Sequence, residues 1–339
     1  MQCYNMATVD MPSKTRHTTV DRDGKPPDTR VLHGRGGMRG RPLRIAARHM
    51  CAIACALSWW LIPGWSAQAQ TAPIRIVAAE NFYGDVARQI GGPEVGVTSI
   101  IAAPGQDPHQ FEASPAAARA LSDANLVIYN GANYDPWIDK LLANTAAAAR
   151  RVIAVAAVVN AKPGDNPHLW YDPATMPVVA TRIADELQAL DPAHADAYRG
   201  RLASFLGSLA PISAAIAAIT AKYAGTPVTA TEPVFGPMAK ALGFVMRDER
   251  FQLAVMNDTE PSASDVAAMQ DDLKGRKVRL LLYNSQVSDD LTERLLAIAR
   301  TAKVPVVGIT ETAPADKSYQ AWITGELDAV RSALDGSGS

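Results

Sequence analysis

The sequence predicts an α/β protein of two lobes, each built on a parallel sheet, joined by one long helix. Three observations lead to this prediction. Apolar runs alternate with amphipathic segments from residue 74 onward, a long Ala-, Leu- and Ile-rich helical stretch follows residue 190, and the alternation resumes near residue 228. Continuous apolar strands between helices are typical of parallel sheets that are covered on both faces.

The first lobe is expected to begin with a strand at 74–79. The serine and proline at 114–115 predict a helix start, because serine caps a first turn and proline suits the first helical position. The elements expected here are strands at 74–79, 95–101, 126–129 and 152–155, and helices at 82–90, from 114, at 135–149 and at 177–190. We therefore predict an N-terminal βα lobe over residues 70–190.

A helical stretch over residues 191–224 is expected to link the lobes. Pro211 lies inside it, and proline removes a helical hydrogen bond, so we expect one bent helix or two abutting ones. The alternation then resumes, with strands at 228–231, 278–283 and 304–309 and helices at 234–242, 262–273, 289–302 and from 318. These elements predict a C-terminal βα lobe over residues 225–339.

Residues 1–69 are predicted to be a secretory leader with an N-terminal extension, either disordered or the product of a misassigned start. Basic residues, an apolar run at 50–62 and Ala-Gln-Ala at 67–69 follow one another in the order of a signal peptide. The run is shorter than the roughly 20 residues that span a bilayer, so a membrane anchor is the weaker alternative. Cleavage near Ala69 would make the mature protein periplasmic.

All three cysteines, Cys3, Cys51 and Cys55, lie in this leader. Cys51 and Cys55 stand at the start of the apolar run, whereas a lipid-anchoring cysteine would stand at its end. A lipid anchor is therefore disfavoured. A mature chain without thiols excludes disulfides and thiolate-ligated metals. Any metal site must then use nitrogen and oxygen ligands.

Histidines in two matching loops predict such a site. Beyond the leader, histidines remain at 109, 168 and 194, and the first two directly follow a proline after a predicted strand. Proline stiffens the stem beneath His109 and His168, and imidazole is a common metal ligand. Glu232 and Glu311 follow strands of the second lobe, and open parallel sheets bind ligands beyond these strand ends. Two imidazoles and two carboxylates would suit Mn, Zn, Fe(II) or Co.

Simpler interpretations exist for each residue. A single histidine is more often a surface or core residue than a ligand, and His194 is expected to be solvated. Glu232 and Glu311 could each be acids that a helix dipole favours, and Pro233 after Glu232 supports this alternative. The remaining acids near these motifs are expected to be solvated or capping groups: Asp107, Glu112, Asp172 and Glu260.

Six short motifs carry a resemblance to one protein family. They are Asn-Phe-Tyr-Gly at 81–84, Asp-Pro-His-Gln-Phe-Glu at 107–112, Asn-Pro-His-Leu-Trp at 166–170, Glu-Pro-Ser at 260–262, Tyr-Asn-Ser-Gln at 283–286 and Glu-Thr-Ala-Pro at 311–314. In this order they resemble the zinc/manganese class of periplasmic substrate-binding proteins. The resemblance implies metal capture outside the inner membrane and delivery to an ABC permease.

Position by position, the resemblance implies the ligand set. His109 and His168 match the first two ligands, Glu232 stands where members have a histidine or a glutamate, and Glu311 stands where they have an aspartate or glutamate. The His-rich loop of typical zinc importers is missing, since residues 156–165 contain no histidine. The transported ligand is therefore expected to be Zn²⁺ or Mn²⁺.

We expect a monomeric binding protein without catalytic activity. The alternatives are a metal-dependent hydrolase that uses the same His/Glu site, and an adhesin or organic-ligand binder with incidental metal binding. The hydrolase is disfavoured because the sequence has no His-Glu-x-x-His pair, no Gly-x-Ser-x-Gly elbow and no phosphate loop. A net charge of −1 gives no sign of a nucleic-acid partner.

Overall fold

The computed structural model describes residues 72–102, 111, 114–145, 147, 149–162, 164–287 and 289–336. All of them belong to the compact unit Gln70–Ser339. The predicted leader lies outside the described residues, so its cleavage near Ala69 stays a prediction. The predicted fold class is confirmed: the described chain forms two parallel four-stranded sheets, with a long bent helix between them in sequence.

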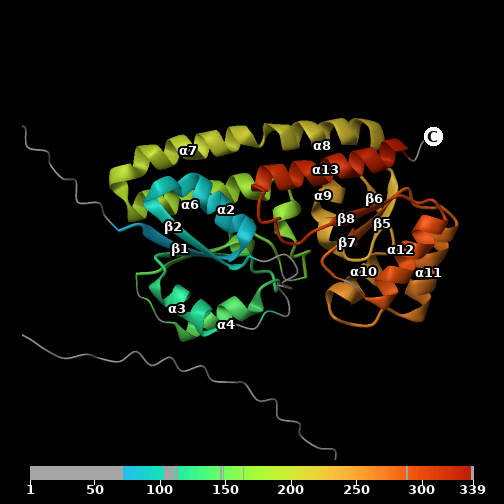
Figure 1. The fold of residues 1–339 in the computed structure, drawn as a ribbon, viewed down its shortest axis with the longest axis horizontal. Helices are drawn as coiled ribbons and strands as arrows, with labels where there is room; N and C mark the ends of the chain where they lie inside the picture. Colours follow the sequence, from blue (N-terminus) through green and yellow to red (C-terminus); the bar gives the residue numbers. More distant parts are fainter. Residues whose placement is uncertain are drawn as a thin grey trace, which may run out of the picture. The chain divides into compact units, whose positions relative to one another are not determined.

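The first sheet has the strand order β2-β1-β3-β4, all parallel. Its strands are β1 (Ile74–Glu80), β2 (Val95–Ile101), β3 (Leu126–Tyr129) and β4 (Arg151–Ala154). The helices are α2 (Asn81–Gly91), α3 (Pro115–Asp123), α4 (Pro136–Asn144), α5 (Val155–Val158) and α6 (Thr175–Leu190), with the short turns η2 (Gly92–Glu94) and η3 (Leu169–Tyr171). In Figure 1, α2 and α6 lie on one face of this sheet and α3 and α4 on the other.

The predicted helix start at Ser114 is confirmed, because its side-chain oxygen accepts a hydrogen bond from the Ala117 backbone N–H at 3.2 Å. The helix expected at 135–149 is shorter than predicted and ends at Asn144.

The linking stretch consists of η4 (Pro192–His194), α7 (Ala195–Ser208) and α8 (Ala210–Tyr223). The break at Leu209 lies just before Pro211, as the missing proline N–H requires. Within the described part of the chain, Pro192–Tyr223 is the one stretch long and apolar enough to cross a membrane. Its large side chains Phe205, Ile212 and Ile219 are nevertheless buried, as expected of a helix that packs along both lobes.

The second sheet has the order β6-β5-β7-β8, again all parallel. Its strands are β5 (Pro227–Ala230), β6 (Val245–Met246), β7 (Leu281–Asn284) and β8 (Val306–Ile309). The helices are η5 (Pro233–Phe235), α9 (Gly236–Ala241), α10 (Glu249–Met256), α11 (Ala263–Lys274), α12 (Asp290–Thr301) and α13 (Tyr319–Gly336). The sequence did not predict β6 or α10, and the strand expected at 278–283 begins only at Leu281.

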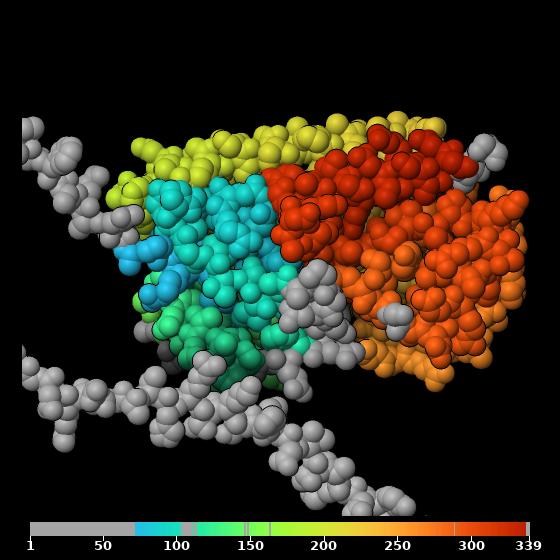
Figure 2. Space-filling view, viewed as in Figure 1, coloured from blue at the N-terminus to red at the C-terminus, as the bar shows by residue number. Residues whose placement is uncertain are grey.

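One hydrophobic cluster contains residues of both lobes, and each lobe has a further cluster of its own. Phe82 of α2 packs on Trp170, with ring centroids 4.6 Å apart, and Tyr171 packs on Phe235 and Trp322 of the second lobe at 5.2 and 5.6 Å. Figure 2 shows α13 lying against both α8 and the α2 segment of the first lobe. Because a large apolar interface restricts domain motion, we expect only small closing movements between the lobes.

A buried carboxyl on α13 stabilises the same interface. Glu326 accepts hydrogen bonds from the Tyr171 hydroxyl at 2.6 Å, from Trp322 Nε1 at 2.9 Å and from the Thr310 backbone N–H at 3.1 Å. Burial raises the pKa of Glu326 from 4.5 to about 7. A raised carboxyl pKa stabilises the folded state at low pH, and this stabilisation is lost as the pH rises.

Replacing Glu326 with glutamine is therefore expected to weaken the pH dependence of folding stability. The contribution of the carboxyl to the free energy of unfolding is complete below pH 4.5 and is lost as the pH rises past about 7. Between these two pH values the free energy of unfolding changes by about 3 kcal/mol at most through this group. The amide does not titrate, so the urea midpoint of E326Q should change less between about pH 5 and about pH 8 than that of the wild type. An identical pH dependence of the urea midpoint in both proteins would show that Glu326 does not contribute to the pH dependence of stability.

Candidate metal centre

His168 presents one ring nitrogen to the space between the lobes. Its Nδ1 lies 2.7 Å from Asn166 Oδ1, while Asn166 Nδ2 donates to the Pro233 carbonyl at 2.6 Å. That second bond fixes which end of the amide faces the ring, so Nδ1 carries the proton and Nε2 is the acceptor nitrogen. A carbonyl-type oxygen on the other ring nitrogen is the usual support of a metal-ligating histidine.

The stem beneath His168 is held by buried polar groups of the first lobe. Asn130 Nδ2 donates to the Pro167 carbonyl at 2.8 Å, and Asn130 Oδ1 accepts from the Tyr83 hydroxyl at 2.7 Å. The Asp135 carboxylate in turn accepts from the backbone N–H groups of Asn130 and Gly131, both at 2.7 Å. These bonds fix the position from which the imidazole projects.

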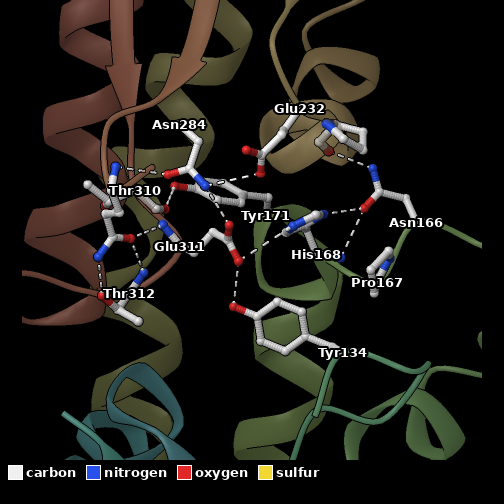
Figure 3. A network of polar contacts seen from close by, with 12 residues as sticks. Tyr134, Asn166, Pro167, His168, Tyr171, Glu232, Asn284, Thr310, Glu311 and Thr312 are labelled. Atoms are coloured by element: carbon white, nitrogen blue, oxygen red, sulfur yellow. Dashed lines mark hydrogen bonds and ion pairs between the residues drawn. The ribbon is translucent and has the colours of Figure 1, made fainter. Parts of the chain in front are cut away.

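Glu311 faces His168 from the second lobe. Its Oε2 lies 3.9 Å from His168 Nε2, longer than a hydrogen bond (Figure 3). The same oxygen accepts from the Tyr134 hydroxyl at 2.9 Å, and Oε1 accepts from Asn284 Nδ2 at 2.6 Å. Burial, followed by the charge on Glu311, raises the pKa of Tyr134 well above 10, so this hydroxyl keeps its proton and donates it.

Glu232 is joined to this pair through Asn284. It follows β5 and precedes η5, but its side chain makes no capping hydrogen bond to that turn. Its Oε2 instead accepts from Asn284 Nδ2 at 3.1 Å, and Figure 3 shows this amide nitrogen between the carboxylates of Glu232 and Glu311. Glu232 is the N-cap residue of η5, so the alternative that a helix dipole favours this acid stays open beside the ligand prediction.

His109 lies outside the described residues, as do Asp107 and Glu112. Among the residues that are described, no three His, Cys, Asp or Glu side chains form a metal-binding group. The structure thus brings His168 and Glu311 together and ties Glu232 to them through an amide. The ligand set itself stays a prediction.

The other acidic and histidine side chains occupy the roles expected for them. His194 is 43% exposed, with Nδ1 2.6 Å from Asp191 Oδ2. Asp172 Oδ1 accepts from the Ala174 backbone N–H at 2.9 Å, as a capping group does. Glu260 is exposed.

The donors and their spacing suit a divalent cation. Zinc binds imidazole nitrogen at about 2.0–2.1 Å and carboxylate oxygen at about 2.0–2.2 Å. The 3.9 Å between His168 Nε2 and Glu311 Oε2 therefore leaves room for one cation bound to both atoms. A cation would also offset the repulsion between two carboxylates that share one amide donor.

A cavity of about 1250 Å³ lies beside this site and not on it. Asn166 and Pro233 line it, but His168, Glu232 and Glu311 do not. The facing pair of His168 and Glu311 therefore lies outside this cavity, with Nε2 and Oε2 3.9 Å apart.

Sequence reasoning missed two residues of the network, Tyr134 and Asn284. Asn284 ends β7 inside the motif at 283–286, and Tyr134 lies in the loop that follows β3. Both positions lie beyond carboxyl ends of parallel strands, where ligands of such sheets bind, so this rule could have identified them.

Comparison with known proteins gives one family. Residues 76–333 match the family described as zinc-uptake complex component A, periplasmic (ZnuA). The manganese ABC transporter substrate-binding lipoprotein PsaA of Streptococcus anginosus is 23% identical over 285 residues, which cover 77% of this chain and 89% of PsaA.

Two solved structures share the fold. The periplasmic zinc-binding protein TroA from Treponema pallidum matches with a TM-score of 0.67 and 19% identity, over 78% of this chain and 99% of TroA. A mutant of the laminin-binding adhesin Lmb from Streptococcus agalactiae matches with a TM-score of 0.65 and 23% identity, over 77% of this chain and 99% of Lmb. At such identities these structures establish the architecture alone.

Proposed function

Since the chain belongs to the family of periplasmic zinc-uptake complex component A proteins, we propose that it captures a divalent transition metal and delivers it to an ABC importer. The observation that carries this proposal is the facing pair of His168 and Glu311, one from each lobe, with Nε2 and Oε2 3.9 Å apart. Binding one cation between them would link the lobes. The importer could then distinguish the metal-bound from the metal-free protein by the relative orientation of the lobes.

The proposed ligands are His109, His168, Glu232 and Glu311. Two carboxylates balance the charge of a divalent cation, and two neutral imidazoles complete a nitrogen and oxygen donor set. Relatives are named for manganese and for zinc, and we propose one of these two metals as the transported ligand. Affinity should fall below about pH 6, where an ordinary imidazole becomes protonated and stops acting as a ligand.

The setting proposed for this capture is the periplasm. The leader would be cleaved near Ala69, and the mature protein would act as a monomer that docks on a permease in the inner membrane. Its role is binding rather than catalysis: the family and the relative PsaA are described as components of metal uptake.

Titration of the exported protein tests the function. The purified protein is stripped of metal with a chelator, analysed for residual metal, and titrated with Zn²⁺ and with Mn²⁺ by calorimetry. We expect one cation per chain and a pH-dependent release. Failure to bind either metal stoichiometrically would contradict the proposal, and turnover of ester, peptide or phosphoester substrates by the metal-loaded protein would favour the hydrolase.

A further inference from the structure

One amide lies between the two carboxylates of the proposed site. Asn284, the last residue of β7, is 2% exposed. Its Nδ2 donates to Glu311 Oε1 at 2.6 Å and to Glu232 Oε2 at 3.1 Å (Figure 3). An amide nitrogen carries two hydrogens, so both bonds form at the same time. One neutral side chain therefore sets the separation of two acidic ones.

The orientation of this amide is fixed by the backbone. Asn284 Oδ1 accepts from the Gln286 N–H at 3.0 Å, and the Asn284 N–H points to Thr231 Oγ1 at 3.3 Å. Because a donor occupies the oxygen end of the amide, the nitrogen end must face the carboxylates. The Asn284 side chain cannot turn away without losing its hydrogen bond from the Gln286 N–H.

Each carboxylate then has one oxygen engaged by the amide. For Glu311 this is Oε1, while Oε2 faces His168 and also accepts from the Tyr134 hydroxyl at 2.9 Å, which leaves it a second lone pair. For Glu232 it is Oε2. A carboxylate held in this way presents its other oxygen to a cation and binds through one atom. One-atom binding keeps the coordination number low, which suits tetrahedral zinc, whereas manganese favours octahedral, oxygen-rich coordination.

Building on the proposed function, we propose that Asn284 is a positioning residue that holds Glu232 and Glu311 as one-oxygen ligands and so favours zinc over manganese. The amide acts through the carboxylates and does not itself touch the cation. Its removal frees both carboxylates to rotate and to bind through two oxygens. This role predicts a change in the ratio of the Zn²⁺ affinity to the Mn²⁺ affinity. A general loss of stability does not produce such a change.

The test compares the dissociation constants for Zn²⁺ and Mn²⁺ of the exported wild type with those of Asn284→Ala and Asn284→Leu. Leucine fills the space of the asparagine without a donor, so it keeps the variant packed if alanine does not. We expect zinc affinity to fall about 10- to 100-fold, the range for groups that support metal ligands. Manganese affinity should fall less, so the ratio should move at least about tenfold toward manganese.

Asn81→Ala is the matched control. The Asn81 amide bonds the Ala313 backbone, donating to its carbonyl at 2.7 Å and accepting from its N–H at 3.1 Å. This variant should melt at a lower temperature and keep the wild-type ratio. An unchanged ratio in both Asn284 variants, or an equal shift in Asn81→Ala, would overturn the positioning role. A wild type that binds neither metal would instead overturn the proposed function, and the positioning role with it.

Discussion

Replacing His168 with alanine is expected to lower the affinity for Zn²⁺ and Mn²⁺ by more than about a hundredfold, since the loss of a ligand should exceed the 10- to 100-fold effect of a supporting residue. The imidazole is 1% exposed, its Nδ1 is fixed by Asn166, and its Nε2 faces Glu311. Alanine removes this nitrogen donor from the proposed ligand set. Calorimetric titration of the demetallated variant measures the effect.

His194→Ala is the control for this experiment. The side chain of His194 is 43% exposed and pairs with Asp191 at the start of the linking helix. The same substitution there should leave both affinities unchanged. His109→Ala is expected to behave like His168→Ala if the loop after β2 supplies the second imidazole. Wild-type affinity in His168→Ala would remove this residue from the site.

Replacing Glu311 with glutamine is expected to abolish tight binding of either metal. The substitution keeps the shape of the side chain but removes its negative charge, which both attracts the cation and balances its burial. In the wild type the Glu311 carboxylate accepts hydrogen bonds from the Tyr134 hydroxyl and from Asn284 Nδ2. The glutamine amide would place its own NH₂ donor against one of these two donors. Elemental analysis after dialysis against metal, together with calorimetry, gives the readout.

Glu186→Gln provides the comparison for Glu311→Gln. Glu186 of α6 is 7% exposed, and its carboxylate pairs with Arg151 and Arg182, both at 2.6 Å. Losing these two ion pairs should lower stability while metal affinity stays as in the wild type. If Glu311→Gln and Glu186→Gln bound metal equally well, the carboxylate of Glu311 would not be a ligand.

The sequence predicted the strands correctly where residue type, run length and flanking segments all indicate a strand. The strands at 95–101 and 126–129 coincide with β2 and β3. The second is a continuous apolar run, and the first is rich in β-branched residues, with Thr98 and Ser99 between its apolar ends. β6 was missed because two residues, Val245 and Met246, give no periodic pattern. The following helix, α10, begins after Asp248 and has Glu249 in its first turn, which is a start signal that the prediction did not use. In the structure Asp248 has a left-handed φ of 59°, and its carboxylate accepts from the Thr229 hydroxyl instead of capping the helix.

The candidate site was predictable only in part. The Pro-His sequence marked His168, because the stiff stem is a local feature. The strand-end rule points to the positions of Tyr134 and Asn284 but not to their hydrogen bonds, because each reaches Glu311 from a distant part of the chain. Such contacts depend on how two lobes pack, which the alternation of strands and helices does not specify.

Anomalous diffraction from crystals of the metal-loaded, exported protein shows whether His168 and Glu311 bind the same cation. Data collected at the Zn or Mn absorption edge locate the cation independently of any assumption about its ligands. We expect one anomalous peak within bonding distance of His168 Nε2 and a Glu311 carboxylate oxygen, at about 2.0–2.2 Å for zinc. A peak elsewhere on the protein, with His168 and Glu311 still facing each other across an empty gap, would contradict this expectation.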